Sequence, residues 1–167
     1  SLKGEIWGSG VNKITITGGE PLLYQAQIQD LLQWAVDSKI KTSVETNGTV
    51  STAIFGYYMS KFLSFIIDLK TPSSGVSSKN IKAGWIKDMM YNPNNWLKIV
   101  VANEEDFRFA LDFIRNFNIR LEQCAFSPMF CDNKPVLGAN QLVQWMIKSG
   151  VSNSIINVQV HKFLNMR

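Results

Sequence analysis

Short β-rich runs alternate along the chain with stretches whose apolar residues recur at helical spacing. Strands are predicted at 13–17, 41–46, 63–68, 96–101, 123–126 and 157–162. Helices are predicted from three sets of apolar residues that each share one helical face: Ile28, Leu31, Leu32, Ala35 and Val36; Phe107, Ala110, Leu111 and Ile114; and Leu142, Trp145 and Met146. Strand, helix and strand in this order predict an α/β fold with parallel strands and helical crossovers.

Local signals mark where these elements begin and end. Asn103, followed by three acids, suits the start of a helix, and Gly150 suits the end of the last one. An apolar stretch at 50–59 follows the second strand. The breaker-rich segment 71–78 is interpreted as a loop, because the alternation resumes beyond it. We therefore expect one domain over residues 1–167.

Polar residues follow each predicted strand, at 17–20, 45–47, 68–70, 102–103, 127–128 and 161–162. In α/β folds the carboxyl ends of parallel strands meet at one edge, where chemistry collects. The strand bodies are apolar by contrast. The sequence therefore predicts a common polar site at this edge.

The segment Gly18-Gly19-Glu20-Pro21 follows the first strand. Two glycines let the backbone approach a ligand closely, and the carboxylate of Glu20 beside backbone carbonyls suits the ammonium group of an amino-acid ligand. An ordinary turn with an acid at the start of the next helix is the competing interpretation.

Other strand exits also allow two interpretations. Glu45 and Asn47 offer an acid and an amide, or belong to a turn built by Asn47 and Gly48. Asp68 and Lys70 point to the same side, as an ion pair or as groups that position ribose hydroxyls. His161 is the only histidine, so no pair of histidines is available for catalysis.

Composition narrows the class of protein. The chain is 46% hydrophobic and 18% charged, with a net charge of +4, and its Lys and Arg residues are spread singly, which disfavours nucleic-acid binding. No apolar run is long enough to span a membrane and no signal sequence opens the chain. Cys124 and Cys131 have no zinc-site spacing, and two thiols favour a reducing, cytoplasmic compartment. Phosphate-loop and dinucleotide motifs are absent.

Several motifs, in order, resemble those of the 7-carboxy-7-deazaguanine synthase family of radical S-adenosylmethionine (SAM) enzymes. They are Thr-Gly-Gly-Glu-Pro-Leu-Leu at 17–23, Glu-Thr-Asn-Gly-Thr at 45–49, Asp-Leu-Lys-Thr-Pro-Ser-Ser-Gly at 68–75, Lys-Ile-Val-Val-Ala at 98–102, Ser-Pro at 127–128 and Gln-Val-His-Lys at 159–162. The resemblance implies a radical-SAM-type (β/α) barrel. It also implies the ring contraction of 6-carboxy-5,6,7,8-tetrahydropterin to 7-carboxy-7-deazaguanine, with release of ammonia, in queuosine and 7-deazapurine biosynthesis.

The resemblance also implies site residues, cofactors and partners. Cofactor contacts would come from Gly18, Gly19 and Glu20 for the methionyl part of SAM, and from Asp68, Leu69, Lys70, Ser127, Pro128, Met129 and Phe130 for its nucleoside. Contacts to the pterin substrate would come from Thr17, Glu45, Asn47, His161 and Arg167. The implied cofactors are SAM, a [4Fe-4S] cluster and Mg²⁺, and the implied partners are a reductant such as flavodoxin and a second copy of the chain.

One departure from the family pattern concerns cysteine. The family carries Cys-x-x-x-Cys-x-x-Cys before the Gly-Gly-Glu-Pro segment, because three thiolates leave one iron open to SAM, whereas no cysteine lies among the sixteen residues before Thr17. We therefore expect the carboxyl-terminal two thirds of a longer enzyme, without the first strand, the cluster loop and the Mg²⁺ ligand, and inactive by itself. The alternatives are a radical SAM enzyme with another substrate and a non-catalytic remnant that binds SAM or a pterin.

Overall fold

A parallel sheet forms the centre of the molecule. The computed structural model describes residues 1–50, 60–76, 82–131 and 134–157. Within them, six strands pair in the order β1-β2-β3-β4-β5-β8, all parallel. Their bounds are β1 (Lys13–Ile16), β2 (Lys41–Thr46), β3 (Leu63–Leu69), β4 (Trp96–Val101), β5 (Cys124–Pro128) and β8 (Ile155–Ile156).

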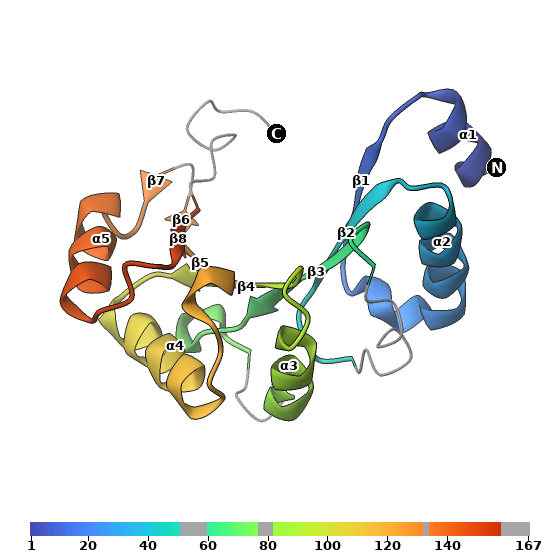
Figure 1. Cartoon of the computed structure of the whole chain (residues 1–167). Coiled ribbons are helices and arrows are strands. Elements are labelled where there is room, and N and C mark those ends of the chain that lie inside the picture. Colours follow the sequence, from blue (N-terminus) through green and yellow to red (C-terminus); the bar gives the residue numbers. More distant parts are fainter. Residues whose placement is uncertain (51–59, 77–81, 132–133, 158–167) are drawn as a thin grey trace.

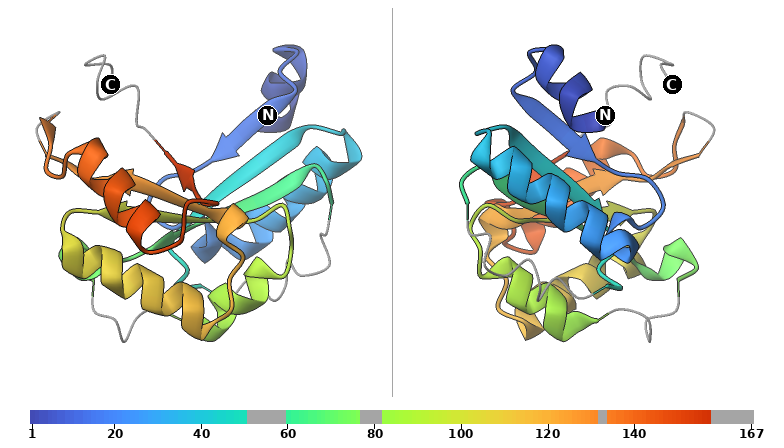
Figure 2. Two further views of the ribbon diagram at one scale, coloured as in Figure 1. Left: turned by 60° about the vertical axis from the view of Figure 1, so that its left-hand side comes forward. Right: turned by 90° about the vertical axis from the view of Figure 1, so that its right-hand side faces the viewer.

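Helices cover one face of this sheet. The helices are α1 (Leu2–Gly8), α2 (Gln25–Asp37), α3 (Ala83–Met90), α4 (Glu104–Asn116) and α5 (Ala139–Lys148). Short 3-10 turns are η1 (Pro21–Tyr24), η3 (Pro72–Ser74) and η5 (Leu121–Gln123), and β6 (Phe130–Cys131) pairs with β7 (Lys134–Pro135) in a small antiparallel hairpin. Helices α2 to α5 lie on the convex side of the curved sheet, and its concave side is open (Figures 1 and 2).

Sequential strand order with helices on a single face is the arrangement of a (β/α) barrel, here opened into an arc. The predicted α/β class and the parallel pairing are thus confirmed. β1 and β8 form the two edges of the described sheet. Whether a further strand adjoins β1 stays a prediction. Among the described helices, none has the length and apolar character needed to cross a membrane.

The hydrophobic core lies between the sheet and the helices. Burial alternates along β3, so that Phe65 and Ile67 face the helices while Ile66 faces the concave side. Phe107 of α4 stacks its ring 5.6 Å from Phe126 of β5. Each large apolar side chain buried in this way contributes about 1.5–3 kcal/mol. This layer fixes the convex face and leaves the opposite face for a site.

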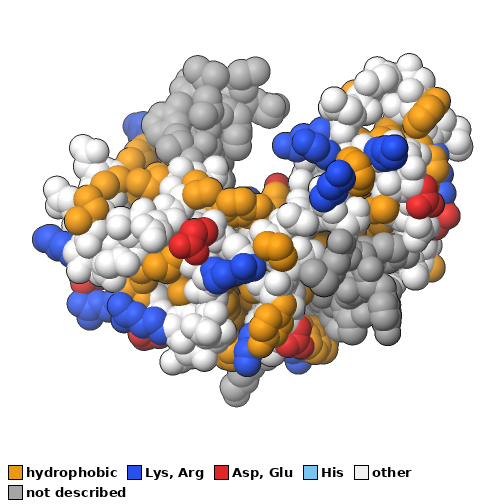
Figure 3. Space-filling view, viewed as in Figure 1, with side chains coloured by type: hydrophobic (Ala, Val, Ile, Leu, Met, Phe, Trp, Pro, Cys, Tyr) orange, Lys and Arg blue, Asp and Glu red, His pale blue; other side chains and the backbone are white. Residues whose placement is uncertain are grey.

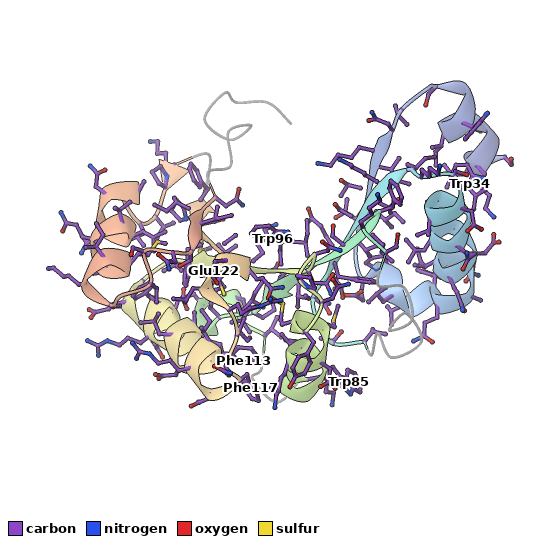
Figure 4. All side chains as sticks on the ribbon, viewed as in Figure 1. Trp34, Trp85, Trp96, Phe113, Phe117 and Glu122 are labelled. Carbon is purple, nitrogen blue, oxygen red and sulfur yellow. The ribbon has the colours of Figure 1, made fainter. Side chains whose placement is uncertain are left out.

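Aromatic residues show the difference between the two faces. Phe113 and Phe117, whose rings lie 4.7 Å apart, belong to the helical side of the sheet. Trp96 lies on the concave side instead (Figure 4). Its neighbour Leu97 is fully buried toward the helices, as the two-residue alternation of a strand requires.

The structure differs from the sequence-based prediction in several elements. Helix α3 was not predicted, because its buried face consists of Ile86, Met89 and Met90 alone and follows a breaker-rich segment. A strand that was not predicted lies at Ile155–Ile156, where it pairs with β5; of the strand predicted at 157–162, Asn157 follows β8, and residues 158–162 lie outside the described residues. β5 extends through Pro128, and the β6–β7 hairpin was also unforeseen. The apolar stretch at 51–59 lies outside the described residues.

Candidate functional site

The concave face of the sheet forms a hollow. A cavity of about 680 Å³ extends along it from Lys13 of β1 to Asn157 after β8, and it is visible in the upper middle of Figure 3. An ion pair lies in this cavity: Lys98 Nζ is 3.6 Å from Glu45 Oε2, across β3. Most of its lining comes from the amino-terminal halves of the strands, such as Lys41, Leu63 and Trp96, and among the lining residues Glu45 belongs to the predicted polar edge.

The glycine pair after β1 is open to solvent. Gly18 has φ +124°, a conformation that side chains rarely adopt, and a Cβ added at Gly18 or Gly19 would meet no atom within 4 Å. The requirement for glycine at position 18 is therefore one of backbone conformation rather than of space. Both residues are exposed, which leaves their backbone accessible to a ligand.

The carboxylate of Glu20 is held by three donors from the protein. Oε1 accepts hydrogen bonds from Leu22 N–H at 3.1 Å and Thr46 Oγ1 at 2.9 Å, and Oε2 accepts one from Asn47 N–H at 2.7 Å. The bond to Leu22 caps the 3-10 turn η1, as the competing interpretation of an acid at a helix start requires. The other two bonds join the end of β1 to the end of β2. Contact between Glu20 and a ligand stays a prediction.

The turn after β2 is fixed by its own side chains. Asn47 Oδ1 accepts from Thr49 N–H at 2.9 Å and from Thr49 Oγ1 at 2.6 Å. Gly48 has φ +71°, and a Cβ there would lie 3.1 Å from Ile86 Cδ1. The predicted Asn-Gly turn is therefore present, and the amide oxygen of Asn47 serves it. Glu45 points instead into the hollow.

The exit of β3 carries the predicted ion pair. Lys70 Nζ lies 2.6 Å from Asp68 Oδ2, with the two side chains 29% and 28% exposed. A half-exposed pair of this kind contributes about 0–1 kcal/mol to stability, so its value to the fold is small. A cavity of about 200 Å³ is lined by Asp68, Leu69, Lys70 and Met129, among others. The structure thus brings together residues from β3 and from β5 that were predicted for the SAM nucleoside.

The other residues predicted at the β5 exit face inward. Ser127, Pro128 and Phe130 are buried, and Ser127 Oγ accepts from Asn157 Nδ2 at 3.1 Å. Met129 N–H donates to Val101 O at 2.8 Å, which ties this segment to β4. Of the four residues at 127–130, Met129 is therefore the one with side-chain surface available to a ligand.

Thr17 is exposed at the end of β1, beside the two glycines. His161 and Arg167 lie outside the described residues. Two residues escaped the sequence analysis as site residues: Lys98 of β4, whose ammonium group lies 3.6 Å from Glu45, and Asp106, which is fully buried at the start of α4. An Asn-x-x-Asp spacing resembling a capping box was the available signal for Asp106.

The two thiols do not form a metal site with other described residues. Burial, and secondarily the charge of Glu122, raises the pKa of Cys124 to about 12, so this thiol is protonated at neutral pH. Cys131 is exposed on β6. In the described part of the chain, no three His, Cys, Asp or Glu side chains gather where they could hold a metal ion.

The sequence is similar to those of known proteins. No protein-family model matches the chain. A 7-carboxy-7-deazaguanine synthase of Clostridium acetobutylicum is 30% identical over 157 residues, which cover 93% of this chain and 67% of that protein. A protein of the same name from Chlorobaculum tepidum is 31% identical, over 90% of this chain and 64% of its own length. The chain thus spans about two thirds of the length of these relatives.

Solved structures share the fold. SuiB of Streptococcus suis, in a crystal structure with S-adenosylmethionine, superposes with a TM-score of 0.67 at 20% identity, over 95% of this chain and 40% of SuiB. A domain of a pyruvate-formate lyase-activating enzyme from Bacteroides vulgatus gives a TM-score of 0.67 at 18% identity, over 89% of this chain and 99% of that domain. The arc of parallel strands is therefore a fold found in other proteins.

Proposed function

The chain belongs to the family of 7-carboxy-7-deazaguanine synthases, and from this premise we propose that the protein binds SAM and 6-carboxy-5,6,7,8-tetrahydropterin. The reaction would be the ring contraction to 7-carboxy-7-deazaguanine, with release of ammonia, in queuosine and 7-deazapurine biosynthesis. The observation that carries the proposal is the placement of the glycine pair, the Glu45–Asn47 turn and the Asp68–Lys70 pair at the carboxyl ends of the adjacent strands β1, β2 and β3.

SAM would lie along the carboxyl ends of β1 to β5. The exposed backbone of Gly18 and Gly19 would hydrogen-bond the methionyl part, because no atom lies within 4 Å of the place where a Cβ would stand at either residue. The nucleoside would occupy the 200 Å³ cavity between the β3 exit and Met129. Thioether and aliphatic surface on one wall and an ion pair on the other suit an adenosine, which has an apolar ring and a polar ribose.

The pterin would lie on the concave face beside SAM. Its aminopyrimidinone edge carries N–H donors, which a carboxylate such as that of Glu45 can accept, and its own carboxylate is an anion, which Lys98 can attract. These two side chains lie 3.6 Å apart, each partly exposed to the hollow. A substrate with both groups could therefore replace their contact with each other by contacts with itself.

The described residues offer contacts for SAM but no ligand set for the two metal cofactors. The residues at 17–20 and 68–70 fit SAM, whereas the described residues provide no ligand set for a [4Fe-4S] cluster or for Mg²⁺. A reduced cluster held by ligands outside the described residues would supply radical chemistry with SAM. The part of this chain would be to orient SAM and pterin and to restrict the access of water.

The proposal is tested by titrating the 167-residue chain with SAM and with the tetrahydropterin, followed by NMR. We expect both to bind, and Gly18→Ala to weaken SAM binding, because alanine disfavours φ +124°. Gly8→Ala is the matched control, since Gly8 has no such backbone conformation and no atom near its added Cβ. Binding of neither ligand would refute the proposal, and binding of SAM without the pterin would favour another substrate.

Catalysis is tested in a chimaera in which the amino-terminal segment of the Clostridium acetobutylicum relative precedes Ser1. We expect mass spectrometry to detect 7-carboxy-7-deazaguanine after anaerobic reconstitution with a reductant. A chimaera that takes up its cluster and cleaves SAM without forming this product would contradict the proposed substrate.

A further inference from the structure

Asp106 is a fully buried carboxylate in the first turn of α4. Its own N–H donates to Asn103 Oδ1 at 3.0 Å, which caps the helix. A carboxylate without partners is unstable in a protein interior, and the favourable field of a helix N-terminus offsets only part of that cost. The side chain of Asp106 therefore depends on specific donors.

Those donors come from two different loops. Asp106 Oδ1 accepts from Ser73 N–H at 2.9 Å, and Oδ2 accepts from Ala102 N–H at 2.9 Å. Ser73 belongs to the loop after β3, which we call the β3 loop (residues 71–75), and Ala102 directly follows β4. A second hydrogen bond joins Ser73 to the start of α4, because Asn103 Nδ2 donates to Ser73 Oγ at 2.9 Å. The start of α4 thus holds the β3 loop at two points.

The β3 loop forms part of the wall of the 200 Å³ cavity at the β3 exit. Thr71, Ser73 and Ser74 line this cavity together with Asp68 and Lys70. Thr71 Oγ1 donates to Val100 O at 3.1 Å, so the near end of the loop is tied to β4. Ser73, in the middle of the loop, carries the contacts to the start of α4. A shift of the loop away from α4 would therefore widen the cavity next to the ion pair.

Asp106 also lines this cavity, but each of its oxygens already accepts a backbone N–H. We propose that Asp106 is a positioning residue, which holds the β3 loop against α4 and thereby sets the shape of the cavity in which the SAM nucleoside binds. The inference rests on the proposed function. It adds a residue that acts on the ligand through the loop rather than by contact.

The test compares Asp106→Asn with Glu105→Gln in the 167-residue chain. Asparagine keeps the shape of the side chain but turns an amide N–H₂ toward one of the two backbone donors. Glu105 is exposed in the same helical turn, so its replacement removes the same charge from the helix N-terminus and leaves the β3 loop contacts in place. Amide hydrogen exchange at Ser73 and Ala102 reports on the loop, and NMR titrations with SAM and with free methionine report on binding.

For Asp106→Asn we expect faster exchange at Ser73 and Ala102 and about a tenfold rise in the Kd for SAM, the scale of one lost charge-assisted hydrogen bond. The Kd for methionine should stay unchanged, because its proposed site lies at the glycine pair after β1. Glu105→Gln should change neither the exchange rates at Ser73 and Ala102 nor the Kd values for SAM and methionine. A merely structural role would weaken the binding of SAM and of methionine alike.

Equal SAM affinities in wild type and a folded Asp106→Asn variant would overturn the inference and leave the proposed function standing. If the wild-type chain has no affinity for SAM, the proposed function is overturned. If, in that case, amide exchange at Ser73 is also the same in Asp106→Asn as in wild type, the role of Asp106 in holding the loop is overturned as well. If Asp106→Asn does not fold, Asn103→Ser serves instead. Serine still caps the helix but lacks the amide N–H₂ that donates to Ser73 Oγ and is too short to replace it, so a SAM affinity equal to that of wild type would contradict the inference.

Discussion

Replacing Glu20 by glutamine tests whether its carboxylate joins the ends of β1 and β2. The carboxylate accepts hydrogen bonds from Leu22 N–H, Thr46 Oγ1 and Asn47 N–H. Glutamine has a single acceptor oxygen, so if that oxygen serves Leu22 and Thr46, the amide N–H₂ faces the N–H of Asn47, which Oε2 now accepts at 2.7 Å.

The loss of one hydrogen bond to a charged group costs about 1.5–3 kcal/mol of unfolding free energy. For a chain of this size each kcal/mol lowers Tm by about 2–4 °C. Urea unfolding followed by circular dichroism measures the change directly. Glu5→Gln is the control, because Glu5 is exposed in α1 and its loss should stay within about 0.5 kcal/mol of wild type.

A double-mutant cycle with Thr46→Val measures the interaction between Glu20 and Thr46 by itself. Thr46 is 3% exposed and donates to Glu20 Oε1, so the two substitutions should show a coupling energy of about 0.5–3 kcal/mol. Two results together would refute the proposed link between the two strands. Glu20→Gln would have the same unfolding free energy as Glu5→Gln, and the effects of the two substitutions in the cycle would be additive.

Four further predictions concern other parts of the chain. Anaerobic titration of the 167-residue chain with iron and sulfide should give no visible cluster absorbance, and about one cluster per chain would contradict this. Because burial raises the pKa of Cys124 to about 12 from 9.0, a thiol reagent at pH 8 should label Cys131 in the native protein and both thiols after unfolding; rapid native labelling of Cys124 would contradict its burial. As the folded-state pKa is the higher one, this thiol should also stabilise the fold less as pH rises from about 9 to about 12. Gly48→Ala should destabilise the chain by at least about 1–2 kcal/mol in urea unfolding, because of its φ of +71° and the contact with Ile86, whereas Gly8→Ala should not destabilise it.

Features that depend on neighbouring residues were predictable from the sequence. The cap of α4 by Asn103 is present, with Oδ1 accepting from Asp106 N–H. The pairing of Asp68 with Lys70 follows from the two-residue period of a strand. Both features rest on backbone geometry within a few residues, which the local sequence determines.

Features that depend on residues far apart in the chain were not predictable. The bonds of Glu20 reach residues 26 and 27 positions away, and that of Asp106 reaches Ser73, 33 positions away. Nothing in the sequence near Glu20 or Asp106 distinguishes an acid that binds backbone donors from one that faces a ligand. The place of β8 is likewise set by its pairing with β5, since Asn157 donates its N–H to Phe126 O.

Side-chain bonds between neighbouring strand exits recur along the edge of the sheet. Glu20 joins the exit of β1 to that of β2, Asp106 joins β3 to β4, and the contact of Asn157 with Ser127 joins β5 to β8. Each bond spans one pair of adjacent strands. An amino-acid change in one exit loop would therefore disturb its direct partner most and distant loops least. Such an edge can diversify its ligand contacts during evolution one strand pair at a time, while the rest of the edge keeps its shape.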